Sequence, residues 1–272
     1  RDAARNKQEL QADQLISCDF TDPDAVKACM QAAKPDYVLH LAGMNNVRRS
    51  WLEPLVCMQA NVSGTLHLLA AASELSAQPT VLVVGSSLSF NPSEDPPRPA
   101  HPYALSKTMQ RMLARSWTHL FDLPVLAAEP SNLIGPGSSA GLCGLLADYV
   151  AKWEKGLQDQ PFRLSSLSEK RDYLDVRDAV RAYERMLFQG TVGQLYRFGS
   201  GKLRSIQEVV QAFEKAAGES FPYTVSDQKP RDKDPQQFGL SAMKQLGWRP
   251  TISFSKSIRE ILQDARFRLA RR

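Results

Sequence analysis

The residues best suited to chemistry in this sequence are a tyrosine and a lysine four positions apart, Tyr103 and Lys107. The segment that contains them has helical periodicity, and positions i and i+4 lie on one face of a helix, so the two side chains are expected to point the same way. An ammonium beside a phenol favours the phenolate, and it is expected to lower the pKa of Tyr103 from its usual value of about 10. Tyr103 could then act as a general acid or base. Ser86 follows an apolar run that predicts a strand, and its hydroxyl could hydrogen-bond the same substrate oxygen.

The elements that must position these residues alternate between strand and helix through the first half of the chain. Strands are expected at Leu15–Ser17, Asp36–Leu41 (buried), Val81–Val84 and Pro124–Ala128, and helices at Asp24–Ala33, Pro54–Leu75 and Tyr103–Leu120. This alternation predicts an α/β fold with a parallel, doubly wound sheet and helices on both faces. From Ser138 the pattern changes, with helices expected at Leu142–Lys155, Ala179–Leu187 and after an N-capping Ser205.

Composition excludes several classes of protein. The chain has 272 residues, of which 43% are hydrophobic and 23% charged, as is ordinary for a globular protein. No run reaches the roughly 18 apolar residues that span a bilayer, so no membrane segment is expected. The cysteines, Cys18, Cys29, Cys57 and Cys143, show neither metal-ligand nor disulfide spacing. They predict reduced thiols in the cytoplasm and no bound metal.

The net charge is +5 and the isoelectric point is near 9.0. Lysine and arginine are interspersed with acidic residues almost everywhere, and the arginine-rich end, Arg266–Arg272, is expected to be a solvated tail. Anionic small molecules that carry a diphosphate explain the positive excess more simply than a nucleic acid does, so no nucleic-acid partner is expected.

Several short motifs follow one another in an order that resembles a known family. They include His40-Leu-Ala-Gly43, Asn61-Val-Ser-Gly-Thr65, Ser86-Ser-Leu-Ser-Phe90, Tyr103-Ala-Leu-Ser-Lys107, Glu129-Pro-Ser-Asn-Leu-Ile-Gly-Pro-Gly137 and Arg171-Asp-Tyr-Leu-Asp-Val176. Together they resemble the extended short-chain dehydrogenase/reductase family of NDP-sugar epimerases, dehydratases and reductases. Within it, the likeness is greatest to enzymes of GDP sugars, the GDP-4-keto-6-deoxy-D-mannose reductases and GDP-mannose 4,6-dehydratases.

The resemblance implies a Rossmann-type dinucleotide-binding domain, residues 1–137 with 172–200, and a smaller C-terminal α/β domain for the nucleotide sugar, residues 138–171 with 201–272. It implies catalytic roles for Ser86, Tyr103 and Lys107. Cofactor contacts are implied for Arg1, Asp19, Phe20, Leu41, Ala42, Gly43, Asn61, Tyr103, Lys107 and Pro130, and substrate contacts for Ser87, Asn132, Arg171 and Arg231. A capping or loop role for Asp19 and an exposed structural role for Arg231 are alternatives, and Asp175 and Asp178 are expected to cap the helix that follows them.

The sequence departs from the family pattern in several places: Phe90 replaces the usual tyrosine, the loop from Ser86 to Tyr103 is shorter than in most relatives, and three further departures bear on function. No glycine-rich G-x-x-G-x-x-G turn, which holds the cofactor diphosphate at a helix N-terminus, occurs before Asp36. We expect that the first strand-helix-strand unit is missing from this sequence, with a natural variant that never had it as the alternative; either way this chain alone should bind a dinucleotide poorly. Glu129 replaces the family's arginine. Leu88 occupies the position at which the 4,6-dehydratases carry an acidic residue, which argues against dehydratase chemistry.

These features favour an NAD(P)-dependent oxidoreductase that reduces a GDP-4-keto-6-deoxyhexose at C4. The resemblance implies that basic residues at Arg1–Arg5 contact the 2′-phosphate of NADP, which favours NADP over NAD; a plain helix start is the alternative for this segment. The alternatives are an NDP-sugar 4-epimerase, which needs the same Tyr-Lys pair, and a non-catalytic nucleotide-binding relative. The helix through Pro54–Leu75 carries two apolar faces, which predicts either a homodimer built on a four-helix bundle or simple core packing.

Overall fold

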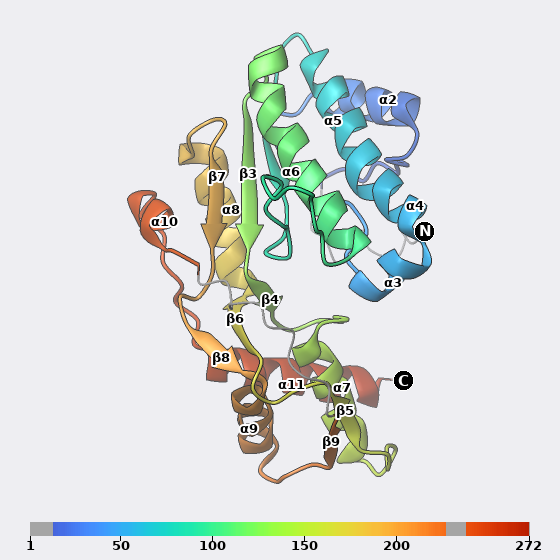
Figure 1. Cartoon of the computed structure of the whole chain (residues 1–272), viewed down its shortest axis with the longest axis vertical. Helices are drawn as coiled ribbons and strands as arrows, with labels where there is room; N and C mark the ends of the chain where they lie inside the picture. Colours follow the sequence, from blue (N-terminus) through green and yellow to red (C-terminus); the bar gives the residue numbers. More distant parts are fainter. Residues whose placement is uncertain (1–12, 227–237, 272) are drawn as a thin grey trace. The chain divides into compact units, whose positions relative to one another are not determined.

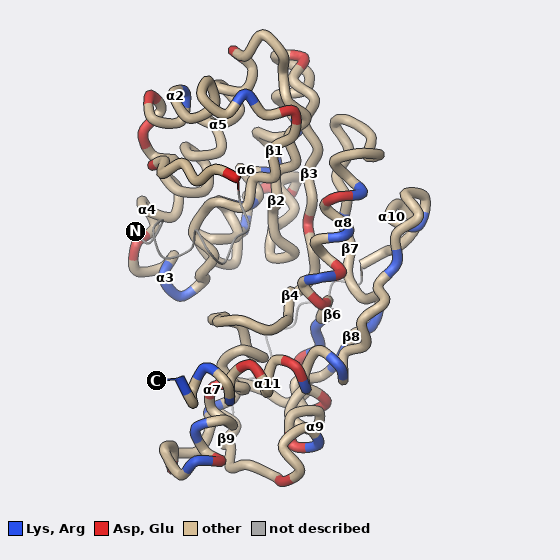
Figure 2. The backbone as a smooth tube through the Cα atoms, turned by 180° about the vertical axis from the view of Figure 1, so that it is seen from behind, with Lys and Arg blue, Asp and Glu red and all other residues tan. Residues whose placement is uncertain are grey.

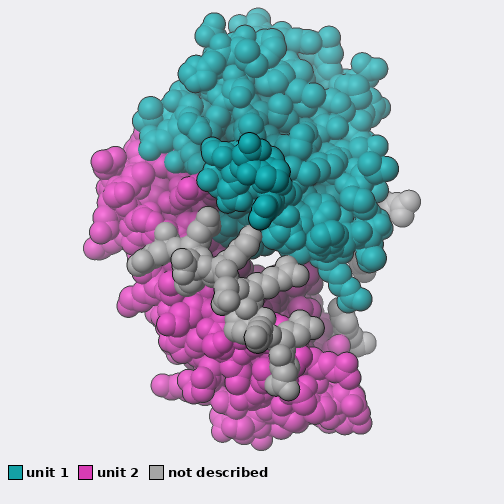
Figure 3. Space-filling view, in the orientation of Figure 1, with its two compact units in different colours: residues 1–127, 190–195 teal, residues 128–189, 196–272 magenta. Residues whose placement is uncertain are grey.

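The structure is a computed structural model that describes residues 13–226 and 238–271. The chain forms two compact units, residues 1–127 with 190–195 and residues 128–189 with 196–272 (Figures 1 and 3). The sequence analysis instead places the boundaries at residues 137, 172 and 200. The difference includes helix α8 (Val176–Gln189), which belongs to the second unit because it packs against strands β4 (Asn132–Ile134) and β6 (Lys170–Asp175).

The first unit contains most of the four-stranded sheet and the helices around it. Its elements are α2 (Pro23–Ala33), β1 (Tyr37–His40), α3 (Val47–Leu52), α4 (Pro54–Met58), the π-helix η1 (Gln59–Ser63), α5 (Gly64–Ser73), β2 (Thr80–Val84), α6 (Pro102–Phe121) and the first half of β3 (Val125–Pro130). The strand order is β1-β2-β3-β7, where β7 is Leu195–Phe198, and the boundary between the units falls within β3 and β7.

The sheet of the first unit confirms the expected α/β arrangement. Strands β1 and β2 are parallel, with His40 opposite Val83, so both strands end at the same edge of the sheet. Buried side chains of β2 pack against helices α5 and α6 in one apolar core: Val81, Val83, Leu68, Leu69, Ala114 and Trp117. The carboxyl ends of parallel strands are where α/β proteins place their ligands, so this edge positions the candidate site.

Two expectations for the start of the chain are wrong. Leu15–Ser17 does not form a strand but an irregular segment. Strand β1 forms where expected, but it is not buried: Tyr37 is 48% exposed and Leu39 is 37% exposed. The reason is its position, since β1 is an edge strand of the sheet that the described residues form.

The helical segment Pro54–Ser73 is largely apolar and contains a π-helical turn. Among the described residues it is the one helix with the length and composition to cross a membrane. Of its most apolar stretch, 44% is buried inside the fold. Core helices of folded proteins meet the same criteria. The π-turn, Gln59–Ser63, carries the buried Asn61, and such turns often occur at functional sites.

The second unit has its own core, in which α7 (Leu142–Trp153), α9 (Ile206–Ala217) and α11 (Phe254–Ala270) pack together. Its remaining elements are β5 (Phe162–Leu164), β8 (Leu203–Ser205), β9 (Tyr223–Val225) and α10 (Ser241–Gln245). The strands form a sheet of order β4-β6-β8 and a β5-β9 pair. Ser205 caps α9 as expected, with a complete capping box to Glu208.

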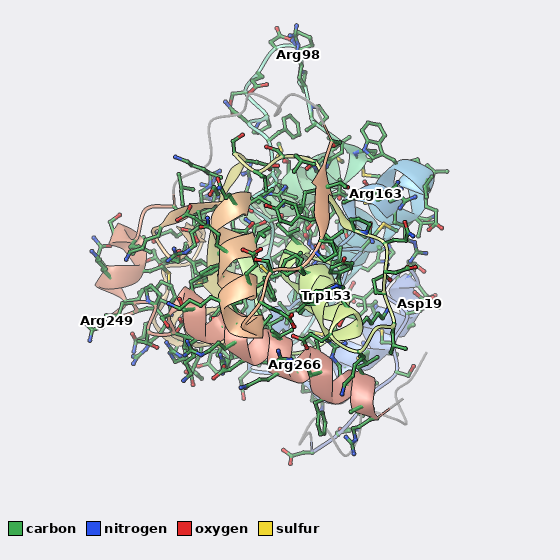
Figure 4. The ribbon with its side chains drawn as sticks, turned by 90° about the horizontal axis from the view of Figure 1, so that it is seen from below. Asp19, Arg98, Trp153, Arg163, Arg249 and Arg266 are labelled. Atoms are coloured by element: carbon green, nitrogen blue, oxygen red, sulfur yellow. The ribbon has the colours of Figure 1, made fainter. Side chains whose placement is uncertain are left out.

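The expectation of a solvated arginine-rich tail is wrong for the part that the structure describes. Those residues form the end of α11, where Arg266 is labelled in Figure 4. Arg266 makes two hydrogen bonds of 2.6 and 2.8 Å to Glu154. Arg268 pairs with Asp148 and Asp264. Basic and acidic residues are interspersed along the backbone of both units (Figure 2), so nearby acidic side chains neutralise part of the positive charge.

Asp178 has a different structural role from the one expected. Asp175 does accept a hydrogen bond from the backbone nitrogen of Arg177 at the start of α8 (2.9 Å). Asp178, fully buried in the first turn, instead accepts hydrogen bonds from the backbone nitrogens of Thr251 and Ile252 (3.1 and 3.0 Å) and pairs with Arg181. It therefore anchors the segment that precedes α11.

We expect Asp178→Ala to lower the free energy of unfolding by about 3 kcal/mol, because it removes a buried carboxylate that accepts from the backbone nitrogens of residues 251 and 252 and pairs with Arg181. Urea denaturation followed by circular dichroism measures this. Asp159→Ala is the matched control, since Asp159 is exposed, and it should change the free energy by less than about 0.5 kcal/mol. Equal effects of the two substitutions would contradict the anchoring role.

Candidate active site

Helix α6 brings the tyrosine and the lysine to one buried face. It begins at Pro102, and the ring of His101 caps it by accepting a hydrogen bond from the backbone nitrogen of Ala104 (2.9 Å). Tyr103 is 3% exposed and Lys107 is 6% exposed. The buried stripe continues along the helix at positions 110, 114 and 117, the spacing of a helix packed on a core.

The hydroxyls of Ser86 and Tyr103 meet at the carboxyl end of β2. Ser86 lies two residues beyond the strand, and its hydroxyl is near enough to the Tyr103 phenol to lower the phenol's pKa. The phenol also donates a 2.9 Å hydrogen bond to the amide oxygen of Asn45, which lies in the loop after β1. The first unit thus gathers a serine, a tyrosine and an asparagine from three segments around one phenolic oxygen.

The pKa of Tyr103 does not move in the expected direction. Burial raises it above the usual value, while the hydrogen bond from Ser86 opposes this rise and lowers it. Lys107 does not lower the phenol's pKa as expected, because its ammonium is bound elsewhere: Nζ donates to the carbonyl of Val84 at 3.3 Å and to the amide oxygen of Gln110 at 2.7 Å. The phenol of Tyr103 is therefore protonated at neutral pH in this structure.

Burial lowers the pKa of Lys107 from 10.5 to about 8, because desolvation disfavours the ammonium. The nearby Cys57 opposes this effect and raises the pKa. Lys107 is thus charged at neutral pH and loses its charge as the pH rises through about 8. Such a buried and perturbed lysine beside a buried tyrosine is typical of a catalytic site.

The loop after β1 has the form of a cradle for a ligand backbone. The Asn61 side chain holds Met44 with two hydrogen bonds, accepting from its nitrogen (2.7 Å) and donating to its oxygen (3.1 Å). Gly43 has φ +144°, and a Cβ there would lie 2.4 Å from the Asn61 side-chain oxygen, so only glycine fits. Leu41, Ala42 and Gly43 follow β1 at the carboxyl edge of the sheet. Leu41 is exposed, and Ala42 and Gly43 have little or no side chain, so a dinucleotide could approach the backbone closely here.

Asp19 and Phe20, expected beside an adenine ring, lie in the irregular segment before α2. The Asp19 carboxylate accepts hydrogen bonds from the backbone nitrogen and hydroxyl of Thr21 (2.9 and 2.8 Å), which is the loop role that the sequence left open. It is exposed (Figure 4). The Phe20 ring stacks on His40, with centroids 5.6 Å apart.

The loop between β2 and α6 forms the rest of this edge. Ser87 is half-buried, and Leu88 is 45% exposed, so no carboxylate occupies that position. The backbone nitrogen of Phe90 donates to Thr108 of α6 (3.0 Å), which ties the loop to the helix. Farther along, Arg98 is exposed at the outer end of the loop (Figure 4).

The remaining site residues that the sequence analysis names do not belong to the first unit's cluster. Pro130 ends β3, and Asn132 in β4 donates to the backbone oxygen of Asp172 in β6 (2.9 Å). Arg171, in β6, forms an ion pair with Glu169 (2.7 Å). All three lie in the second unit and keep their roles as predictions, while Arg1 and Arg231 lie outside the described residues. Glu129, the replacement for the family's arginine, is buried and paired with Arg197 (2.8 Å).

Sequence reasoning missed two residues of the site, Asn45 and Gln110. Asn45 had no signal of its own, because its contact with Tyr103 joins residues 58 positions apart. Gln110 could have been found, since it is the polar residue seven positions after Tyr103 on the same helix stripe. Among the described residues, no group of three or more histidine, cysteine, aspartate or glutamate side chains is placed to hold a metal ion.

The geometry suits proton transfer to or from one oxygen atom. A protonated phenol, a serine hydroxyl and an ammonium lie at the carboxyl edge of a parallel sheet, next to a glycine cradle. A phenol in these surroundings can donate a proton to an oxygen that gains negative charge, and the serine can hydrogen-bond the same oxygen.

Comparison with known proteins identifies relatives along almost the whole chain. A family model described as GDP-mannose 4,6 dehydratase matches residues 2–261. GDP-6-deoxy-D-mannose reductase of Pseudomonas aeruginosa is 29% identical over 90% of this chain and 85% of its own length. A solved structure of RMD from Pseudomonas aeruginosa complexed with NADPH has a TM-score of 0.84 and 28% identity, covering 93% of this chain and 88% of that one. UDP-glucose 4-epimerase of Thermus thermophilus, solved in complex with NAD, has a TM-score of 0.74 and 27% identity, covering 91% of this chain and 83% of that one.

Proposed function

Because this chain belongs to the GDP-mannose 4,6 dehydratase family, we propose that it reduces the C4 keto group of a GDP-4-keto-6-deoxyhexose with NADPH. The family and its relatives establish the broader statement: the chain is an NAD(P)-dependent enzyme of the extended short-chain dehydrogenase/reductase type, from a family that acts on nucleotide sugars. The relative that is a GDP-6-deoxy-D-mannose reductase supports the more specific proposal, reduction of the C4 keto group.

One observation carries the choice of reduction, which is the protonated state of Tyr103. Its phenol donates a hydrogen bond to Asn45, burial raises its pKa, and an acceptor such as the Asn45 oxygen bonds only the protonated form. Reduction of a ketone needs a proton donor at this position, whereas oxidation of a sugar hydroxyl, the first step of epimerisation or dehydration, needs a base. Leu88 supports the same choice, since an aliphatic side chain cannot move the second proton of a dehydration.

The chain's own residues then divide the work at the sugar oxygen. The chemistry that a bound NADPH supplies is a hydride for the C4 carbonyl carbon, which leaves NADP and a negative charge on the carbonyl oxygen. Ser86 hydrogen-bonds that oxygen, and Tyr103 gives it a proton, so the product is a hydroxyl group. Tyr103 then regains a proton from solvent. Lys107, whose ammonium is bound to the Val84 carbonyl and to Gln110 rather than to the phenol, would hold the cofactor at this edge of the sheet.

The test is an assay of NADPH absorbance with GDP-4-keto-6-deoxy-D-mannose as the substrate. We expect one NADPH oxidised for each keto sugar consumed. Conversion of UDP-glucose to UDP-galactose with no net change in cofactor would instead identify a 4-epimerase. The sequence contains no glycine-rich turn before Asp36, so the assay should be run over a wide range of NADPH concentrations, with the bound fraction measured by fluorescence.

We further propose that the chain forms a homodimer through helices α3 to α6 and acts in the cytoplasm. These helices contact one another within the first unit (Figure 1) and expose large apolar side chains: Trp51, Leu52, Leu55, Val56, Leu66, Met109 and Met112. Leu55, Val62 and Leu66 recur at helical spacing, as Met109 and Met112 do on α6. An apolar surface of this kind is typical of a protein-protein interface, and a second copy would complete a four-helix bundle.

We expect Leu66→Glu combined with Met109→Glu to convert the dimer to a monomer, because carboxylates in an apolar interface lose their hydration. Size-exclusion chromatography with light scattering measures the mass. Leu157→Glu is the control, since Leu157 is also exposed but lies outside these helices, and it should leave the dimer intact. A wild-type chain that is monomeric at micromolar concentration would rule the interface out.

A further inference from the structure

A chain of buried polar side chains leads away from Lys107 into the first unit. The Lys107 ammonium donates to the side-chain oxygen of Gln110 (2.7 Å), and the side-chain nitrogen of Gln110 donates to the hydroxyl of Thr65 (2.7 Å). His40 Nε2 lies 3.0 Å from the same hydroxyl. Gln110 and Thr65 are fully buried and His40 is 3% exposed, so water does not compete for these bonds.

The direction of every bond in this chain is fixed by Thr65. Its hydroxyl has one hydrogen, which it donates to the backbone oxygen of Asn61 (2.7 Å). Thr65 can therefore only accept from Gln110 and from His40. The amide of Gln110 must turn its nitrogen toward Thr65, and for that reason its oxygen must face Lys107. His40 must carry its proton on Nε2.

His40 is suited to this fixed role because it stays neutral. Burial, with a smaller contribution from the Lys107 charge, lowers its pKa from 6.5 to about 4. A neutral ring adds no second charge beside the ammonium. The other titratable group that influences Lys107 is Cys57 on α4, which raises its pKa.

We propose that Gln110 is a positioning residue for the catalytic lysine: anchored by Thr65, it holds its amide oxygen against the Lys107 ammonium and thereby keeps Lys107 charged and in place. The proposal rests on the proposed function only in calling Lys107 catalytic. The hydrogen bond between Lys107 and Gln110 is present in the structure whatever reaction the chain performs. An acceptor bonded to the ammonium stabilises the charged form against the desolvation that burial imposes. The motif lysine is therefore supported by a glutamine that lies outside the motif.

The test is a direct titration of Lys107 by NMR of protein labelled with ¹³C at lysine Cε, with the Lys107 signal assigned by its loss in Lys107→Met. We expect Gln110→Leu to lower the pKa of Lys107 by about one pH unit, and Gln110→Glu to raise it. Thr65→Val should act like Gln110→Leu, because the amide is no longer held in one orientation, and Thr65→Ser should behave as the wild type. In activity assays, the loss of kcat/KM at high pH should begin about one pH unit lower in Gln110→Leu.

Thr108→Val is the matched control. Thr108 lies on the same helix, is 1% exposed and bonds the backbone of Phe90 rather than Lys107, so the substitution should leave the pKa of Lys107 unchanged. An unchanged pKa in both Gln110→Leu and Thr65→Val, or an equal change in Thr108→Val, would overturn the proposal. Absence of keto-sugar reduction in the wild type would overturn the proposed function but not the titration result. Circular dichroism establishes that each variant is folded, and Gln110→Glu gives the opposite sign should Gln110→Leu fail to fold.

Discussion

Tyr103→Phe is expected to lower kcat by about 10²–10⁴-fold while the affinity for NADPH and for the nucleotide sugar changes little. The substitution removes one oxygen atom, which in the structure donates a hydrogen bond to Asn45, lies near Ser86 and is the proton donor of the proposed reaction. The ring remains in its apolar cluster with Met44 and Cys57, so the fold should be retained. Steady-state kinetics and isothermal titration calorimetry separate turnover from binding.

The matched control for Tyr103→Phe is Tyr183→Phe. Tyr183 is equally buried, in α8, and its hydroxyl has no hydrogen-bond partner among the described residues. Loss of this hydroxyl should leave turnover unchanged. If Tyr103→Phe also turns over at the wild-type rate, Tyr103 does not take part in the mechanism.

Lys107→Met is expected to lower kcat/KM by about 10²–10³-fold, because the site loses the ammonium that would hold the cofactor beside the substrate. The same substitution should raise the free energy of unfolding by about 1–3 kcal/mol at pH 7, because an ammonium is no longer buried. Substitution of a lysine on the surface would give no such gain. Activity and stability therefore should move in opposite directions, which kinetics and urea denaturation measure on the same preparation.

The pH dependence of Lys107 has a definite sign. The pKa of Lys107 is about 8 in the folded chain and 10.5 for an ordinary lysine. Between pH 8 and pH 10.5 the unfolded chain therefore binds a proton that the folded chain does not. For this reason the contribution of Lys107 to the free energy of unfolding rises with pH over this range. The stability advantage of Lys107→Met should accordingly shrink from pH 8 to pH 10.5. Wild-type kcat/KM should fall as the pH rises through about 8, where the ammonium is lost. A stability difference that is independent of pH would contradict a lowered pKa.

The sequence predicted local features of this fold well. The tyrosine-lysine helix and the strand that precedes it form where the periodicity placed them, and the Ser205 cap is present, because neighbouring residues determine these features. The meeting of Ser86 with Tyr103 follows from the same logic, since a strand end and a helix start form one edge of an α/β sheet.

Features that depend on distant partners could not be read from the pattern. Asp178 binds a segment about 73 residues away, Gln110 is oriented by a threonine 45 residues earlier, and Arg266 pairs with Glu154 across 112 residues. The sequence predicts the pKa shift of Tyr103 with the wrong sign, because helical spacing shows neither the burial that raises the pKa nor the binding of the Lys107 ammonium by Gln110 and the Val84 carbonyl.

The most direct measurement of the central claim follows deuterium from the transferred position of NADPH C4 into the sugar. With GDP-4-keto-6-deoxy-D-mannose as the substrate, we expect one deuterium at C4 of the product hexose for each NADPH oxidised, and a rate of transfer by Tyr103→Phe that is lowered in the same proportion as kcat. Product that carries no deuterium at C4, or transfer by Tyr103→Phe at the wild-type rate, would contradict a site in which the phenol of Tyr103 protonates the oxygen of a reduced C4 carbonyl.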